Sequence, residues 1–235
     1  LARTGQWDEL AGLLDTLIST AADDDAIALM VRRAQLTQAQ LEDPTDAIDR
    51  YRDILTLAPD EPTVIEALEA LFDDPDFAGS VAPLLQPVYE RRDDWQSLIG
   101  VFQVRIDSSD RPDEKVAWYY QIADLYEQKG EAAELAFDQY LAAAGVDPGR
   151  EETLNRLLRL ADDLSCHAEL VAQMQPLVDE IDDDVRRRET HRTLAAVCRD
   201  RTDDAGGAEG HLRALLQIDD GDMPAIDDLI GLYRG

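Results

Sequence analysis

Lysine and asparagine are almost absent from this sequence of 235 residues, which contains only Lys115, Lys129 and Asn155 of these two types. Its 51 acidic residues against 22 basic ones give a net charge of −29, and aspartate outnumbers glutamate 35 to 16. A surface this acidic repels nucleic acids and anionic membranes and keeps the chain soluble. A GC-rich genome or a saline habitat explains the composition better than a groove evolved for basic ligands, because surface charge alone does not identify a partner.

Long hydrophobic runs are also missing, and no segment is long enough to span a bilayer. There is no signal peptide and no initiator methionine. The sequence opens near the start of one repeat cycle and closes just after a repeat helix, which indicates a fragment of a longer protein. We expect a soluble monomer of the cytoplasm or the periplasm that neither inserts into membranes nor binds nucleic acid.

The motifs of common enzymes are absent as well. The sequence has no glycine-rich phosphate loop, no Gly-x-Ser-x-Gly and no His-Glu-x-x-His. Pairs of carboxylates are frequent, but in so acidic a chain they do not single out a catalytic acid and base. We therefore expect no enzyme activity and no cofactor.

No segment combines alternating β-branched residues with hairpin turns, so the sequence predicts no β-sheet. Apolar residues recur at helical spacing along the chain and predict an all-α fold of about thirteen antiparallel helices. Residues 115–148 show the repeating unit most clearly, as two amphipathic helices on either side of a turn at 129–131. Gly130 suits the end of the first helix, where a positive φ is common, and Pro148 cannot continue the second.

This helical hairpin occurs three times. Small residues thirteen positions apart let the two helix axes approach, and they mark each copy: Ala34 and Ala47, Ala123 and Ala136, Ala195 and Ala208. The helix before each hairpin opens with Trp7, Trp95 or His167. The second cycle has an additional helix, predicted over residues 81–91. The cycles span residues 6–73, 76–163 and 166–234, and we expect them to form a single elongated domain over residues 1–235.

The pattern resembles the tetratricopeptide repeat (TPR), and we expect a bacterial member of that family. Its pattern positions are occupied by Tyr119, Ile122, Ala123, Tyr126, Ala136, Tyr140, Ala143 and Pro148, with one extra residue in the turn. The resemblance implies a right-handed α–α superhelix, a solenoid that serves as a scaffold and binds a peptide or partner domain on its concave face. The alternative is a structural or regulatory segment of a larger enzyme or secretion assembly, with no ligand of its own.

In that family the first helix of each hairpin lines the concave face, so the resemblance also predicts groove residues. They are Val31, Gln35, Gln38 and Ala39 in the first hairpin, Tyr120, Asp124, Glu127 and Gln128 in the second, and Arg192, Ala196, Arg199 and Asp200 in the third. A plain solvated face is an equally good interpretation, because surface positions of a repeat are free to vary. The carboxylate clamp of chaperone-binding members is not expected, because Asn155 lies outside the hairpins.

Arg188, Arg192 and Arg199 share one face of the third hairpin's first helix and form an arginine stripe. Such a stripe could grip an acidic peptide or a phosphate group. In a protein with this many carboxylates, arginines more often pair with neighbouring aspartate and glutamate. The sequence leaves both interpretations open.

Two aspartate runs, at 23–25 and 182–184, resemble calcium ligands. The EF-hand loop, with its central glycine and terminal glutamate, is absent around both. Each run precedes the first helix of a hairpin, where aspartate caps free N–H groups and meets the positive end of the helix dipole. We therefore predict helix caps rather than a metal site.

The three histidines and two cysteines lie in the last third of the chain. His167 and His191 stand where other cycles have packing residues, and we predict that His211 is exposed. Cys166 and Cys198 lie at similar heights on two helices that we expect to be antiparallel. A zinc site is conceivable there, but no ligand signature matches. A disulfide is more plausible than zinc, and free buried thiols are the leading interpretation.

Overall fold

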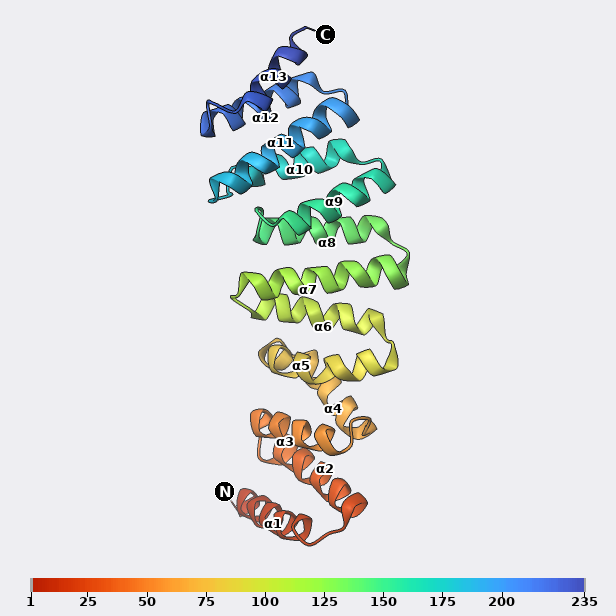
Figure 1. The fold of residues 1–235 in the computed structure, drawn as a ribbon. Coiled ribbons are helices and arrows are strands. Elements are labelled where there is room, and N and C mark those ends of the chain that lie inside the picture. The colour runs from red at the N-terminus through yellow and green to blue at the C-terminus, as the bar shows by residue number, and fades with distance from the viewer. Residues whose placement is uncertain (1, 235) are drawn as a thin grey trace. The chain divides into compact units, whose positions relative to one another are not determined.

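This computed structural model describes the backbone of residues 2–234 and the side chains of residues 6–22 and 24–234. The described chain contains thirteen α-helices, one π-helical turn and no strand, so the predicted all-α fold and number of helices are confirmed. The helices belong to two compact units, Leu1–Ser108 and Ser109–Gly235. Within each unit every helix packs against the next one in the chain (Figure 1).

The first unit contains six helices. They are α1 (Ala2–Ile18), α2 (Asp23–Gln40), α3 (Pro44–Leu57), α4 (Pro62–Phe72), α5 (Pro75–Arg92) and α6 (Trp95–Ser108). The α2–α3 pair is the first predicted hairpin, and its two alanines, Ala34 and Ala47, have no exposed surface. The additional helix predicted over residues 81–91 is α5, but it begins at Pro75. Asp74 caps it, and a proline in the first turn loses no helical hydrogen bond, so the helix starts at this proline.

The second unit contains seven helices and the π-helical turn. They are α7 (Pro112–Leu125), η1 (Tyr126–Gly130), α8 (Ala133–Val146), α9 (Glu151–Leu164), α10 (His167–Val178), α11 (Asp184–Arg201), α12 (Ala205–Ile218) and α13 (Met223–Leu232). The second and third predicted hairpins are α7–α8 and α11–α12.

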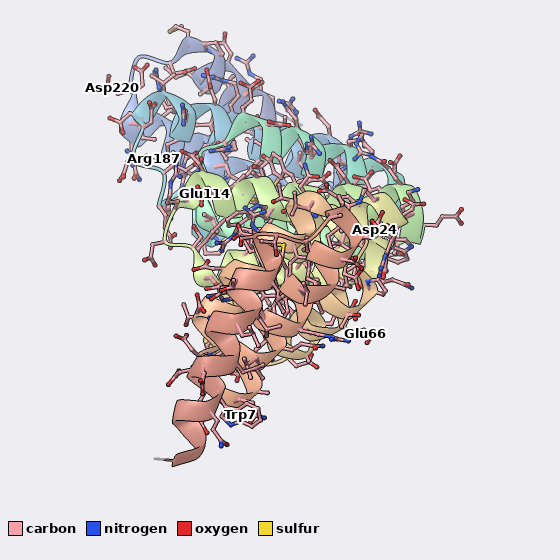
Figure 2. All side chains as sticks on the ribbon, turned by 90° about the horizontal axis from the view of Figure 1, so that it is seen from below. Trp7, Asp24, Glu66, Glu114, Arg187 and Asp220 are labelled. Carbon is pink, nitrogen blue, oxygen red and sulfur yellow. The ribbon has the colours of Figure 1, made fainter. Side chains whose placement is uncertain are left out.

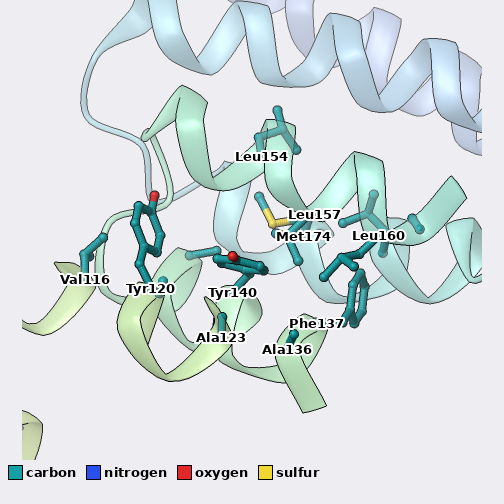
Figure 3. Close-up of a cluster of buried hydrophobic side chains, with 14 of the residues drawn as sticks. Val116, Tyr120, Ala123, Ala136, Phe137, Tyr140, Leu154, Leu157, Leu160 and Met174 are labelled. Carbon is teal, nitrogen blue, oxygen red and sulfur yellow. The ribbon is translucent and has the colours of Figure 1, made fainter. Parts of the chain in front are cut away.

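One continuous apolar core runs through α7 to α11. Ala123 of α7 and Ala136 of α8 are fully buried in it and lie on neighbouring helices, as Figure 3 shows. Tyr140, Leu157 and Met174 fill the space around them from α8, α9 and α10. The predicted burial of the alanine pair is confirmed, and the small side chains explain how α7 and α8 pack closely enough to share this core.

The extra residue of the α7–α8 turn is absorbed by the π-helical turn η1. A π turn winds one more residue into each hydrogen-bonded ring than an α-helix does. The chain therefore reaches its left-handed conformation one residue late, at Glu131 with φ 48°, whose N–H donates to the Tyr126 carbonyl. The prediction that Gly130 takes the positive φ is wrong, because no glycine in the described chain has one.

Aspartate side chains cap several helices, among them α3, α5, α11, α12 and α13. Asp183 accepts hydrogen bonds from the backbone N–H groups of Val185 and Arg186 at 2.9 and 3.0 Å, which confirms the cap predicted for the second aspartate run. The first run does not behave this way. Its helix α2 begins at the run itself, with Ala22 at the cap position and no side-chain cap, so Asp24 lies inside the first helical turn. The side chain of residue 23 lies outside the described residues.

Carboxylate side chains cover the outside of the helices. Asp24, Glu66, Glu114 and Asp220 project from helices and loops in both units (Figure 2). Among the described residues, no helix combines the length and the apolar character that crossing a bilayer requires.

Candidate functional site

Four helices of the second unit, α7, α9, α11 and α13, are joined by arginine–carboxylate pairs. The pairs are Arg156–Asp124 at 2.8 Å, Arg201–Asp162 at 3.2 Å and Arg199–Asp228 at 3.0 Å. Each pair connects helices that are not consecutive in the chain. Alternate helices therefore lie side by side as one layer, while α8, α10 and α12 pack against them.

Arg156 of α9 is held between two tyrosine rings. Its guanidinium carbon lies 4.7 Å from the centre of the Tyr120 ring and 5.3 Å from that of Tyr140. Its Nη1 atom donates to Asp124 at 2.8 Å and to the Tyr140 hydroxyl at 2.7 Å. Burial raises the pKa of the Tyr140 phenol, so the ring stays neutral and presents its π face to the cation. This network holds α7, α8 and α9 together.

The predicted groove residues of the second hairpin take part in these contacts. Tyr120 is nearly buried, and its hydroxyl shares a 2.5 Å hydrogen bond with the Thr153 hydroxyl of α9. Asp124 and Glu127 each pair with an arginine of α9. Gln128, on the π-helical turn, is exposed. Tyr120 and Asp124 therefore tie α7 to α9, and Glu127 ties the π-helical turn to α9. A ligand would compete with these internal bonds.

Each arginine of the predicted stripe pairs with an aspartate. The pairs are Arg188–Asp219, Arg192–Asp222 at 2.5 Å and Arg199–Asp228 at 3.0 Å. Asp222 is also the buried cap of α13, so its pair fixes the start of that helix against α11. This geometry corresponds to the second interpretation of the stripe, in which the arginines serve the packing of helices.

The predicted groove residues of the first hairpin also fall into two groups, those that pack within the hairpin and those that face solvent. Val31 is buried, and Gln38 accepts a hydrogen bond from the Tyr51 hydroxyl at 2.8 Å. Gln35 and Ala39 are exposed. Half of these positions therefore support the α2–α3 hairpin and half face solvent.

An open furrow runs between α9 and α11. One hollow of about 660 Å³ lies between their N-terminal halves, and a second of about 430 Å³ lies between their C-terminal halves. Thr193 lines both hollows, so the two lie next to each other. We call this surface the α9–α11 furrow.

The first hollow carries an excess of negative charge. Its charged lining consists of Asp147, Glu151, Glu152 and Glu189 against Arg150 and Arg186. Arg150 is bonded to Asp147 at 2.9 Å, and Glu152 to Arg156 at 3.0 Å. The carboxylates of Glu151 and Glu189 have no ion-pair partner among the described side chains.

Thr190 adds an unused polar group to the first hollow. The residue is only 6% exposed, yet it lines the hollow. Its hydroxyl makes no hydrogen bond within the described part of the chain. Although the residue is buried, its unpaired hydroxyl oxygen is not a fully buried atom, so it is available to a group that enters the hollow.

The second hollow is apolar at its floor. Leu158 of α9 and Ala196 and Val197 of α11 line it, and Val197 is buried. The charged residues at its rim are already paired, as the Asp162 carboxylate shows with partners at 3.0 Å in His167 and 3.2 Å in Arg201. A side chain entering this hollow would meet mainly hydrocarbon.

Sequence reasoning located only one wall of the furrow. Ala196, Arg192 and Asp200 of α11 were among the predicted groove residues and line the second hollow. The α9 wall was not predicted, because the resemblance places the groove on the first helix of each hairpin and α9 follows the α7–α8 hairpin. The signal was present, since Asn155 and Leu158 of the wall lie at helical spacing on the side away from the buried Leu157.

His191 and His211 form a buried pair between α11 and α12. Both are only 2% exposed, and their Nδ1 atoms lie 3.1 Å apart. The prediction that His211 is exposed is therefore wrong. Arg50 and Gln139 occupy this register in the other hairpins and reach solvent from half-buried positions, whereas the shorter imidazole stays beneath the surface. His167 is half-buried, as Trp95 is, and the match of their packing sockets stays a prediction.

Both thiols are free. Cys166 precedes α10 and packs at the edge of the apolar core, whereas Cys198 is fully buried with its sulfur toward Gly207 of α12. Burial raises the pKa of both thiols, so neither is an activated nucleophile. Within the described side chains, no group of three or more histidine, cysteine, aspartate or glutamate residues is arranged to hold a metal ion.

No protein-family model matches this chain, and no curated protein matches it. Among solved structures it is similar to the C-terminal part of a TPR repeat-containing protein from Cytophaga hutchinsonii. The two are 13% identical, the match covers 95% of each chain, and the TM-score is 0.36. A likeness this loose carries no argument about the furrow, whose interpretation rests on the geometry above.

Proposed function

We propose that this chain is a TPR-like scaffold that binds a segment of a partner protein in the α9–α11 furrow. The observation that supports this function is the pair of adjacent hollows, of about 660 and 430 Å³, on a layer of helices whose other charged groups are largely paired internally. Hollows of this size match the range in which proteins bind ligands, about 300–1,000 Å³. Because the furrow is long and open, it suits several side chains of one segment.

The charge of the chain favours a protein partner over a nucleic acid. With a net charge of −29, the surface repels phosphate backbones. The furrow itself contains free carboxylates, an unused hydroxyl and an apolar floor, which are groups that recognise side chains. Binding and not catalysis is the proposed role.

Site-specific photo-crosslinking in the cells that encode this protein tests the proposal. A benzoylphenylalanine at Thr193, which lines both hollows, should form an adduct with a protein on irradiation. The matched control carries the same group at Asp138, an exposed position of α8. That position should form no adduct, because α8 lies outside the furrow.

A second variant checks that the furrow itself holds the partner. Thr193→Arg should remove the partner from a pull-down of the full chain while leaving the helical circular dichroism unchanged. Equal adducts at both positions, or none at Thr193, would contradict the proposal. The absence of any adduct is what the alternative predicts, in which the chain is a structural segment without a ligand of its own.

A further inference from the structure

We infer that the α9–α11 furrow selects an extended segment with a lysine or arginine side chain in the first hollow and an aliphatic side chain in the second. This inference rests on the proposed function and adds the chemistry of the partner.

The first hollow is suited to one cationic side chain. Glu151 of α9 and Glu189 of α11 line it, and neither carboxylate has an internal ion-pair partner among the described residues. Its lining holds four carboxylates against two guanidinium groups, so a single added cation brings the site closer to neutrality. The hydroxyl of Thr190 supplies a neutral acceptor at the same place. An ammonium or guanidinium group donates only, and it therefore matches all three acceptors.

The second hollow is suited to an apolar side chain. Its floor is formed by Leu158, Ala196 and Val197. The rim charges are paired within the chain, so they offer a ligand little new electrostatic attraction. A charged ligand group would lose hydration there without gaining a partner, whereas a leucine or isoleucine side chain would gain from burial.

The distance between the hollows sets the spacing of the two side chains. Thr190 marks the first hollow and Val197 the floor of the second, and both belong to α11. Seven helical residues span about 10 Å, because an α-helix rises 1.5 Å per residue. An extended chain advances about 3.3 Å per residue, so about three residues of the ligand cover that length.

Nuclear magnetic resonance with the full chain tests this chemistry directly. The probes are short glycine–serine peptides with blocked ends that carry one lysine and one leucine about three residues apart. Binding should shift the backbone amide signals of Thr190, Thr193 and Ala196. Replacing the peptide's lysine by glutamate, or its leucine by serine, should weaken binding. Adding salt should weaken the lysine peptide more than a peptide that keeps only the leucine.

Variants of the protein separate the two hollows. The double variant Glu151→Gln/Glu189→Gln should reduce the preference for lysine over glutamate about threefold or more, as expected for two partly exposed ion pairs. The control, Glu134→Gln/Asp138→Asn, removes the same charge from exposed positions of α8 and should leave that preference unchanged. Ala196→Leu fills the second hollow and should abolish only the preference for leucine.

Three results would overturn the inference: equal binding of the lysine and glutamate peptides, no shift with any peptide at millimolar concentration, or an unchanged lysine preference in the Glu151/Glu189 variant. Crosslinking distinguishes this failure from failure of the proposed function. A partner captured at Thr193 through a segment without a basic residue would refute only the chemistry. No capture at Thr193 would refute the scaffold function itself.

Discussion

Acidification should loosen the α11–α12 hairpin at its buried pair of imidazoles. The Nδ1 atoms of His191 and His211 lie 3.1 Å apart, so one ring donates and the other accepts. The His191 Nε2 atom lies 3.9 Å from the exposed Asp179 carboxylate, whereas the His211 Nε2 atom is buried without a partner among the described residues. The tautomers that leave no buried N–H unpaired place a proton on His211 Nδ1 and on His191 Nε2. Both rings are then neutral.

The size of the effect follows from the pKa of His211. Burial and then the neighbouring His191 lower it from 6.5 to about 4, and the more distant carboxylates of Asp179 and Asp204 oppose this shift. Burial lowers the pKa of His191 as well, and Arg187 acts in the same direction while Asp179 opposes it. Because the folded state disfavours the protonated rings, their contribution to stability is complete above pH 6.5 and is lost as the pH falls toward 4. At pH 5 the loss from His211 is about 2 kcal/mol.

The thiol of Cys198 reports on this opening. It has no exposed surface, and its sulfur lies against α12, so it reacts only when the hairpin opens. In a Cys166→Ser background, the rate at which the Cys198 thiol reacts with 4,4′-dithiodipyridine is measured between about pH 7.5 and pH 5. At each pH this rate is divided by the rate of an unfolded peptide that contains the same cysteine. The normalised rate should rise about thirtyfold, the population change that 2 kcal/mol represents.

Two variants decide whether the histidine pair is the cause. His191→Leu/His211→Leu removes both partners together, so it should retain stability at neutral pH and lose the pH dependence. His167→Gln removes a half-buried histidine elsewhere and should keep the full rise. A flat profile in the parent protein, or the same rise in the double variant, would refute the reasoning.

Two glycine-to-alanine substitutions in α12 should change the stability of the protein in opposite directions. A Cβ at Gly207 would overlap the capping carboxylate and lie 3.0 Å from the Cys198 sulfur. A Cβ at Gly210 would meet nothing within 4 Å. Gly207→Ala should cost about 1–3 kcal/mol and Gly210→Ala should gain about 0.5–1 kcal/mol in urea unfolding, so equal effects would contradict the packing. Ala123→Leu should overpack the buried α7–α8 contact and lower stability by about 1–3 kcal/mol, and an unchanged melting temperature would show that the register is misassigned. Tyr120→Phe should cost about 1–2 kcal/mol because it leaves a buried threonine hydroxyl of α9 without its partner, and a neutral effect would mean that water replaces the phenol.

The sequence by itself determined the local architecture. Ala123 and Ala136 predicted where two helices approach, and both are fully buried. Asp183 predicted a helix start, and its carboxylate accepts the first free N–H groups of α11. These signals are short in range: a cap acts within one turn, and an alanine pair acts within one hairpin. Such interactions can be recognised from spacing without knowing which other helices come near.

Only the tertiary structure decided which residues distant in the sequence contact each other, and the candidate site depends on those contacts. Arg192 pairs with Asp222, which lies thirty residues further along the chain. Its charge is therefore already compensated before a ligand arrives. Thr190 became informative only when its burial beside an open hollow was visible. Glu189 is one carboxylate among many in the sequence, and it stands out only because no arginine reaches it. Pairing and burial are properties of three-dimensional neighbours, so periodicity could locate the helices but could not say which of their polar groups remain free.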